Sequence, residues 1–153
     1  MLDGLVSILL LWVAYVDHKT MKIPDKLNLM LGFCCLLSCI QNPNITLMER
    51  MFGFAIISVP MYLLCLFIPE AFGGGDIKLT AVMGFYLGWK RMLVGAYISF
   101  LIGGVQAVYI LQINKSRKDR TTHMAFGPAL CFGMWIAMLC GNDLISWYFG
   151  LWS

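Results

Sequence analysis

Charged residues are scarce in this sequence. Only 12% of its 153 residues are Asp, Glu, Lys or Arg, whereas 60% are hydrophobic, and the mean hydropathy is +0.79. A soluble domain is roughly 45–50% apolar and about 25% charged. Because no soluble fold of this length could bury so much apolar surface, lipid must surround most of the chain. The sequence therefore predicts an integral membrane protein.

Paired cysteines and clustered histidines are also missing. All six cysteines lie inside apolar runs, none forms a CxxC pair, and neither of the two histidines has ligand spacing to them. A free cysteine behaves as a small hydrophobic residue that buries readily. The pattern therefore supports neither a zinc site nor a disulfide framework, and we expect no metal and no cofactor.

The first apolar run, residues 2–16, lacks the features of a cleavable signal peptide. No basic residue precedes it, Asp3 lies within it, and no small-residue cleavage site follows it. We interpret this run as the first membrane helix of the mature protein.

Long apolar runs, in contrast, are plentiful. There are six of them, at residues 2–16, 27–40, 51–68, 77–89, 92–113 and 124–140. Crossing the hydrocarbon core takes about 20 helical residues, so the shorter runs must extend into their polar flanks or thin the bilayer locally. We predict an all-α polytopic membrane protein of about six transmembrane helices. No linker is visible, so residues 1–153 are expected to form a single membrane-embedded domain.

The basic residues predict the orientation, because Lys and Arg concentrate in cytoplasmic loops. With the N-terminus outside, eight of the eleven basic residues lie inside, and only Arg50, Lys90 and Arg91 lie outside. The opposite orientation inverts this ratio, so we expect both termini outside. The basic run at residues 115–120 then belongs to an inside loop, and the net charge of +3 indicates no nucleic-acid partner.

Two of the eight acidic residues border the apolar runs at one membrane face. Asp17 directly follows the first run and Asp76 directly precedes the fourth. Two crossings separate them, so both lie at the same face, which the charge distribution makes cytoplasmic. An ionisable residue there is costly unless it is partnered or hydrated, which makes each aspartate a functional candidate. The alternative for either one alone is an interfacial helix cap.

The residues around each aspartate favour a constrained site. Residues 73–75 are all glycines, which permit positive φ angles and a close backbone approach. They place Asp76 in the first turn of a helix, where the helix dipole favours a carboxylate. Ile23 is pushed out of the helical region by Pro24, so residues 17–26 are predicted to form a constrained loop.

Two carboxylates at a partly desolvated face can hydrolyse a peptide bond. Like charges a few ångströms apart do not ionise together easily, so one group keeps its proton near neutral pH. The ionised partner then takes a proton from water while the protonated one hydrogen-bonds the scissile carbonyl. Which aspartate plays which part stays open, because the pair titrates as a unit.

Three motifs occur in order along the chain: Asp17-x5-Ile23-Pro24-Asp25, Gly73-Gly74-Gly75-Asp76-Ile77-Lys78 and Phe126-Gly127-Pro128. Together they resemble the type IV prepilin peptidases, membrane aspartyl proteases whose second aspartate lies in a GxGD motif. The resemblance covers nearly the whole chain. It implies that Asp17 and Asp76 are the catalytic pair, and that the other motif residues shape the site or contact the substrate.

The resemblance also implies a substrate and a location. Members of the family remove a short basic leader from prepilins or pseudopilins, for type IV pili or protein secretion. Cleavage follows a glycine just before the substrate's hydrophobic helix, on the cytoplasmic side of the inner membrane. Longer members carry an additional CxxC segment linked to N-methylation. Because only residues 17–26 separate the first two runs here, we expect a short form without the methyltransferase function.

Two other functions stay open at this point. A small ion-coupled carrier would use an acidic residue near the bilayer midplane and often shows an internal repeat, whereas both aspartates here border the membrane face and we find no repeat. A catalytically silent assembly subunit is the other alternative, and the intact pair of aspartates argues against it. The sequence does not indicate an oligomeric state.

Overall fold

The computed structural model describes residues 2–68, 72–114 and 126–150, and within these ranges the chain forms six helices and no strand. The helices are α1 (Leu2–Thr20), α2 (Asp25–Gln41), α3 (Leu47–Phe67), α4 (Gly74–Leu87), α5 (Trp89–Asn114) and α6 (Gly127–Gly150). The predicted all-α class is confirmed. The basic run at residues 115–120 lies outside the described residues.

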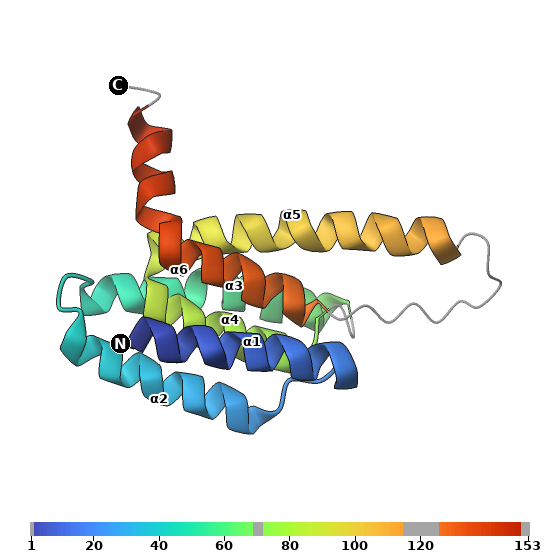
Figure 1. Ribbon diagram of the computed structural model, residues 1–153, viewed down its shortest axis with the longest axis horizontal. Coiled ribbons are helices and arrows are strands. Elements are labelled where there is room, and N and C mark those ends of the chain that lie inside the picture. Colours follow the sequence, from blue (N-terminus) through green and yellow to red (C-terminus); the bar gives the residue numbers. More distant parts are fainter. Residues whose placement is uncertain (1, 69–71, 115–125, 151–153) are drawn as a thin grey trace.

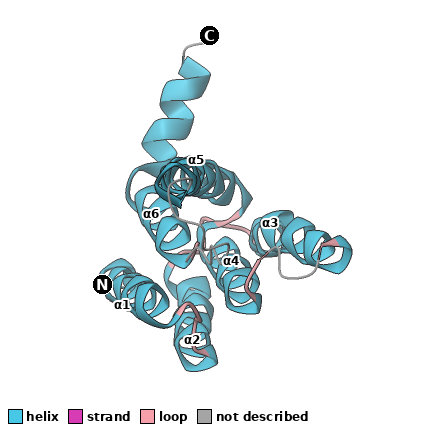
Figure 2. Cartoon of the chain, turned by 90° about the vertical axis from the view of Figure 1, so that its right-hand side faces the viewer, coloured by secondary structure: helices cyan, strands magenta, loops and turns pink. Residues whose placement is uncertain are grey.

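The helices form a bundle in which consecutive helices run in opposite directions (Figure 1). The short helix α4 lies at its centre and packs against α2, α3, α5 and α6, while α1 packs against α2 and α6 (Figure 2). The last part of α6 turns away from the bundle (Figure 1). Because the helices alternate in direction, the C-terminus of α1 and the N-terminus of α4 lie toward the same end.

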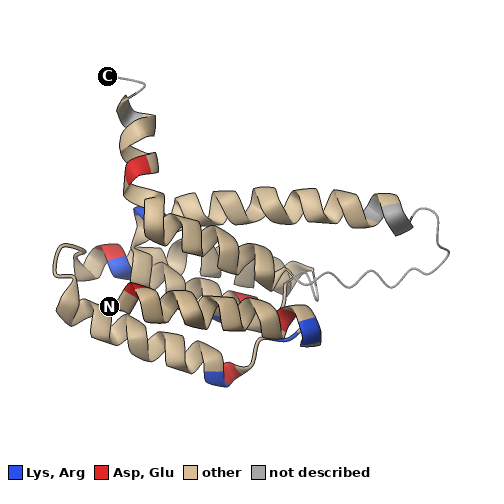
Figure 3. Cartoon of the chain, viewed as in Figure 1, with Lys and Arg blue, Asp and Glu red and all other residues tan. Residues whose placement is uncertain are grey.

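Large apolar side chains cover the outside of the bundle as well as filling its core. Leu10, Leu79 and Met83 are fully buried, whereas Trp12 is 61% exposed and Phe33 is 63% exposed. Three helices, α3, α5 and α6, are long and apolar enough to cross a membrane. Apart from Asp143 within α6, the charged residues of the described ranges lie near helix ends, and the long stretches between them are uncharged (Figure 3). An apolar outer surface of this kind suits contact with lipid.

Two glycines let the central helix approach α3 closely. A Cβ atom on Gly53 would overlap the Gly84 backbone and lie 2.8 Å from the Gly88 carbonyl carbon. Small residues allow this kind of contact between membrane helices. Gly88 ends α4 with a φ of 76°, which a glycine adopts without strain. The chain then turns directly into α5.

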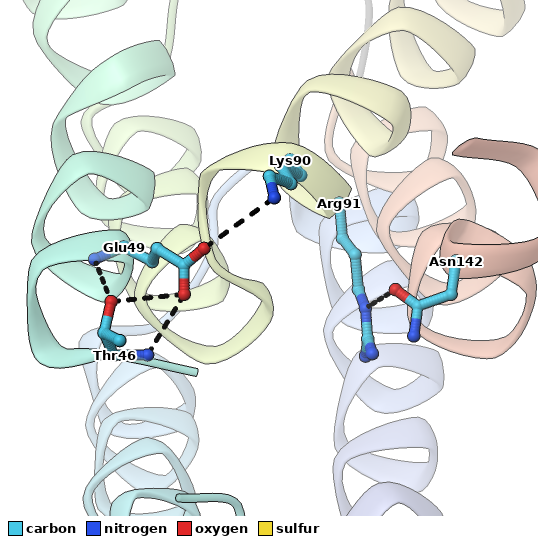
Figure 4. A network of polar contacts seen from close by, with 5 residues as sticks. All are labelled: Thr46, Glu49, Lys90, Arg91 and Asn142. Atoms are coloured by element: carbon cyan, nitrogen blue, oxygen red, sulfur yellow. Dashed lines mark hydrogen bonds and ion pairs between the residues drawn. The ribbon is translucent and has the colours of Figure 1, made fainter. Parts of the chain in front are cut away.

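The end of the bundle opposite the aspartates is held by a polar network. Thr46 and Glu49 form a capping box at the start of α3, and Lys90 lies 4.0 Å from the Glu49 carboxylate. Arg91 Nε donates to Asn142 Oδ1 at 2.7 Å, which links α5 to α6 (Figure 4). These contacts hold the starts of α3 and α5, and α6 at Asn142, at that face.

Candidate active site

Asp17 lies in the last turns of α1 and is 4% exposed. Its Oδ2 accepts a hydrogen bond of 3.1 Å from the backbone N–H of Gly127, the first residue of α6. A Cβ at position 127 would lie 2.6 Å from the Asp17 Cγ, so this approach requires glycine. Burial raises the pKa of Asp17, and the Gly127 hydrogen bond and the nearby His18 partly offset that rise.

Asp76 lies in the first turn of α4 and is 8% exposed. Its backbone N–H donates to the Gly73 carbonyl at 3.0 Å, while its side-chain Oδ1 has no hydrogen-bond partner among the described residues. The pKa of Asp76 is raised to about 6, first by burial and second by the negative charge of Asp17, with the Gly73 backbone opposing the rise.

The two aspartates therefore lie toward one end of the bundle and interact electrostatically. They come from α1 and α4, and α6 packs against both helices. The predicted placement of both residues toward one end matches the structure. A buried pair of carboxyl groups with raised pKa values can hold a single proton between them. Such a pair offers a general base and a general acid at the same place.

The loop after Asp17 is shorter than predicted. We expected residues 17–26 to form a loop, but α1 continues to Thr20 and α2 begins at Asp25. The loop therefore comprises only residues 21–24, and Pro24 is the N-cap of α2, with φ −64° and ψ 134°. The φ angle agrees with the value of about −65° that the proline ring imposes. Asp17 is positioned by a helix and not by a loop.

Of the three glycines before Asp76, two leave room for close neighbours, and none has a positive φ angle. Gly88 is the only glycine with positive φ in the described ranges, so that part of the expectation is wrong. A Cβ on Gly75 would lie 2.8 Å from the Ile23 Cβ, and one on Gly73 would lie 3.3 Å from Asp76 Oδ2. Gly74 faces open space. The motif therefore lets the α1–α2 loop pack directly on the start of α4.

Asn28 completes this junction, although it was not among the predicted site residues. It is 5% exposed, and its Nδ2 donates to the Gly75 carbonyl oxygen at 3.3 Å. The available signal was a carboxamide near the start of an apolar run, one turn after Pro24. Its Oδ1 has no partner among the described residues.

Three other motif residues, Lys78, Phe126 and Pro128, lie against residues other than the two aspartates. Lys78 Nζ forms an exposed ion pair with Asp25 Oδ1 at 2.6 Å. The Phe126 ring lies 5.7 Å from the ring of Phe100 and covers Gly103. Pro128 lies in the first turn of α6, beside a small cavity of about 40 Å³. Within the described parts of the chain, no three His, Cys, Asp or Glu side chains gather closely enough to hold a metal ion.

Comparison with known proteins agrees with the motifs. The model of the type IV leader peptidase family matches residues 4–108, which include both aspartates. The chain is 31% identical over 157 residues to a prepilin leader peptidase/N-methyltransferase of Legionella pneumophila, covering 97% of this chain and 54% of that protein.

Two further relatives carry the same name. One from Bacillus subtilis is 31% identical over 144 residues, covering 92% of this chain and 56% of the relative. One from Aeromonas hydrophila is 28% identical over 153 residues, covering 94% of this chain and 52% of the relative. The chain thus spans about half the length of these curated relatives. No solved structure gives a significant match.

Proposed function

The chain belongs to the type IV leader peptidase family, and from this premise we propose that it is a membrane aspartyl endopeptidase that removes leader peptides from prepilin-like substrates. The observation that carries the proposal is the buried pair of carboxyl groups, Asp17 and Asp76. The family supplies the reaction class, and the pair supplies groups able to perform it. The proposal covers the peptidase step alone.

The pair performs hydrolysis by moving one proton. The ionised carboxylate takes a proton from water as the water oxygen attacks the scissile carbonyl carbon, and the protonated carboxyl donates a hydrogen bond to the carbonyl oxygen. Gly127 fixes one oxygen of Asp17, whereas the buried Asp76 Oδ1 has no hydrogen-bond partner among the described residues. The two groups titrate together, so the roles belong to the pair.

The substrate is a prepilin or pseudopilin whose basic leader precedes an apolar helix. We place the pair at the cytoplasmic face of the inner membrane, with about six crossings and both termini outside. The distribution of Lys and Arg supports this orientation. A scissile bond must be extended to be attacked, because a helical carbonyl is hydrogen-bonded. The junction just outside the substrate's apolar helix meets that need.

The alternative functions have less support. An ion-coupled carrier would need its acidic residue near the bilayer midplane, whereas Asp17 lies near the C-terminal end of α1 and Asp76 at the start of α4. A silent assembly subunit has no use for a buried pair whose unpartnered oxygen costs stability.

The test is co-expression of this chain with candidate prepilins and pseudopilins, with cleavage observed as a gel shift of the substrate. The Legionella pneumophila relative serves as positive control, and the Asp76→Asn variant as negative control. We expect a shift with at least one substrate that the relative processes. If the relative processes every substrate and this chain, present in the membrane at equal level, processes none, the proposed function is wrong.

A further inference from the structure

An apolar groove opens beside the candidate site. Helices α2 and α3 both pack against α4 (Figure 2) and leave between them a cavity of about 500 Å³. Its walls include Leu29 and Leu36 of α2, Phe54 of α3 and Phe85 of α4. Leu29 is 76% exposed and Leu36 is 64% exposed, so the groove opens to the outside of the bundle. We call it the α2–α4 groove.

One end of the groove carries a buried polar group without a partner. Asn28 lines the groove, is 5% exposed, and its Oδ1 accepts no hydrogen bond within the described residues. Its Nδ2 donates to the Gly75 carbonyl at 3.3 Å. The reverse orientation of the amide would place two oxygen atoms against each other, so Oδ1 is the atom left over. A buried acceptor of this kind calls for a donor, which a ligand or an ordered water can supply.

The polar end of the groove lies next to the candidate catalytic pair. Gly75, which Asn28 contacts, immediately precedes Asp76. From Asn28 to Leu36, eight helical residues span about 12 Å, or roughly two turns of a helix lying alongside. A substrate polypeptide that passes Asp76 and then enters the membrane therefore reaches the polar end of the apolar groove next.

The occupant must be apolar and must also bring a hydrogen-bond donor to one end. A lipid tail is apolar but has no donor. The first four N–H groups of a helix have no partner within that helix. A substrate that is extended at its scissile bond and helical just beyond it presents these groups at the groove's polar end.

We propose that the α2–α4 groove binds the first two turns of the substrate's apolar helix, with Asn28 Oδ1 accepting a hydrogen bond from its N-terminal N–H groups. This inference rests on the proposed function and adds to it a binding site for the part of the substrate that is kept. The groove sets the register, because the helix start is held at Asn28 and the residues before it reach Asp76.

Gly32 allows the groove to be filled without disturbing the fold. It lines the groove, and a Cβ at this position meets no atom within 4 Å. Gly104 of α5 is a matched control, because it is also helical, outside the groove and open to a Cβ. Gly32→Ala, Gly32→Leu and Gly104→Leu are compared in proteoliposomes with a processed prepilin. We expect Gly32→Leu to raise KM about tenfold and Gly32→Ala to raise it less, with Gly104→Leu equal to the original chain.

Photo-crosslinking identifies the occupant directly. A photoreactive residue replaces Leu36 in the groove or, as control, the exposed Val108 of α5, in an Asp76→Asn background that keeps the substrate intact. We expect Leu36 to give an adduct with the substrate's apolar helix and Val108 to give none. Adducts with lipid alone, or equal KM values for the Gly32 and Gly104 variants, would overturn the groove assignment while leaving the peptidase proposal intact. Absence of cleavage by the original chain would overturn both.

Discussion

The two ends of the helical bundle differ in how far their buried polar groups are hydrogen-bonded. Opposite the aspartates, Arg50 is 2% exposed and donates four hydrogen bonds, to Ser38 Oγ at 2.8 Å, the Ser38 carbonyl at 3.2 Å, the Asn42 carbonyl at 3.0 Å and the Phe85 carbonyl at 3.3 Å. Ser38 and Asn42 lie at the C-terminal end of α2 and Phe85 lies in α4, so Arg50 ties α3 to both of these helices. Here a buried charge stabilises the fold.

At the aspartate end, two buried oxygens are unpartnered within the described residues, Asn28 Oδ1 and Asp76 Oδ1. Each unsatisfied group costs about 1–3 kcal/mol. Stability is therefore concentrated at one end, and hydrogen-bonding capacity for a ligand at the other. Substitutions at the two ends should separate activity from stability.

The largest expected effect is the loss of cleavage in Asp17→Asn and Asp76→Asn. Each variant should lose at least about 10³-fold in kcat/KM, because a paired acid and base act as a unit. The double variant should be no worse than either single one. Thermal unfolding in detergent should show Asp76→Asn to be at least as stable as the original chain, because it removes a desolvated carboxyl group. Substantial cleavage by either single variant would contradict the assignment.

At the opposite end, Arg50→Met should lower the free energy of unfolding by about 2–4 kcal/mol, because several buried acceptors lose their donor. Cleavage per folded molecule should change little. Arg91→Met is the control, since it removes one exposed hydrogen bond to Asn142 and should cost less than about 1 kcal/mol. An Arg50→Met chain that melts normally but cannot cleave would break the contrast between the two ends.

The sequence could predict the groups that carry chemistry but not how they are packed. The alternation of apolar runs placed Asp17 and Asp76 toward one end, because that result needs only a count of crossings. The close approach at the glycines was predicted correctly and their positive φ angles were not. The partner in that approach could not be predicted, because the neighbour of Gly75 is Ile23, 52 positions away, and no local pattern reveals it. Asn28 was missed for the same reason, since its partner Gly75 lies 47 residues further on.

The sequence and the structure give different numbers of candidate membrane-spanning helices. Six apolar runs correspond to six helices, but α2 and α4 have only 17 and 14 residues, and three helices meet the length and hydropathy of a span. Both short helices begin at the aspartate end, α2 at Asp25 and α4 at Gly74, and run toward the opposite end. The number of crossings and the orientation stay predictions.

A third prediction concerns the contact that positions Asp17. Gly127→Ala adds a methyl group that would lie 2.6 Å from the Asp17 Cγ, so the carboxyl group must shift and its backbone hydrogen bond must lengthen. A displacement of about 1 Å at a catalytic group costs about 10²-fold in rate. Gly104→Ala, where the methyl enters open space, should leave kcat unchanged. Equal kcat values for the two variants would show that Gly127 is not needed to place Asp17.

A fourth prediction follows from the raised pKa of Asp76, about 6 against an ordinary 3.8. The folded state binds the proton more tightly, so this stabilising contribution is complete below pH 3.8 and is lost as pH rises to about 6. The melting temperature should fall through that window relative to Asp76→Asn. Because the Asp17 charge is the second cause of the rise, Asp17→Asn should move the fall to lower pH. An unchanged profile in Asp17→Asn would show that the two carboxyl groups do not interact.

The same titration predicts the pH dependence of cleavage. The pH profile of kcat/KM reports the pKa values of the unliganded enzyme. Above about pH 6 Asp76 loses the proton that the pair must share, so kcat/KM should fall about tenfold per pH unit on that limb. A profile that is flat from pH 5 to 8 would mean that the reaction needs no proton on the pair.

The smallest expected effect concerns Lys78, a motif residue that is exposed and so is not one of the buried polar groups compared above. Its ion pair with Asp25 is short, 2.6 Å, but both side chains are exposed, at 58% and 75%. Exposed pairs contribute about 0–1 kcal/mol, because water screens them and two side chains must be ordered. A double-mutant cycle of Lys78→Met and Asp25→Asn should therefore give a coupling energy of unfolding below about 1 kcal/mol, smaller still in high salt.

Cleavage assays of the original chain, the two single variants and the double variant show whether Lys78 has a second role. If the ion pair is its whole contribution, both single variants lower kcat/KM equally and only slightly. If Lys78→Met lowers kcat/KM more than tenfold while Asp25→Asn does not, the ammonium group acts on the substrate, and the aspartate end holds a charged contact beyond its two carboxyl groups.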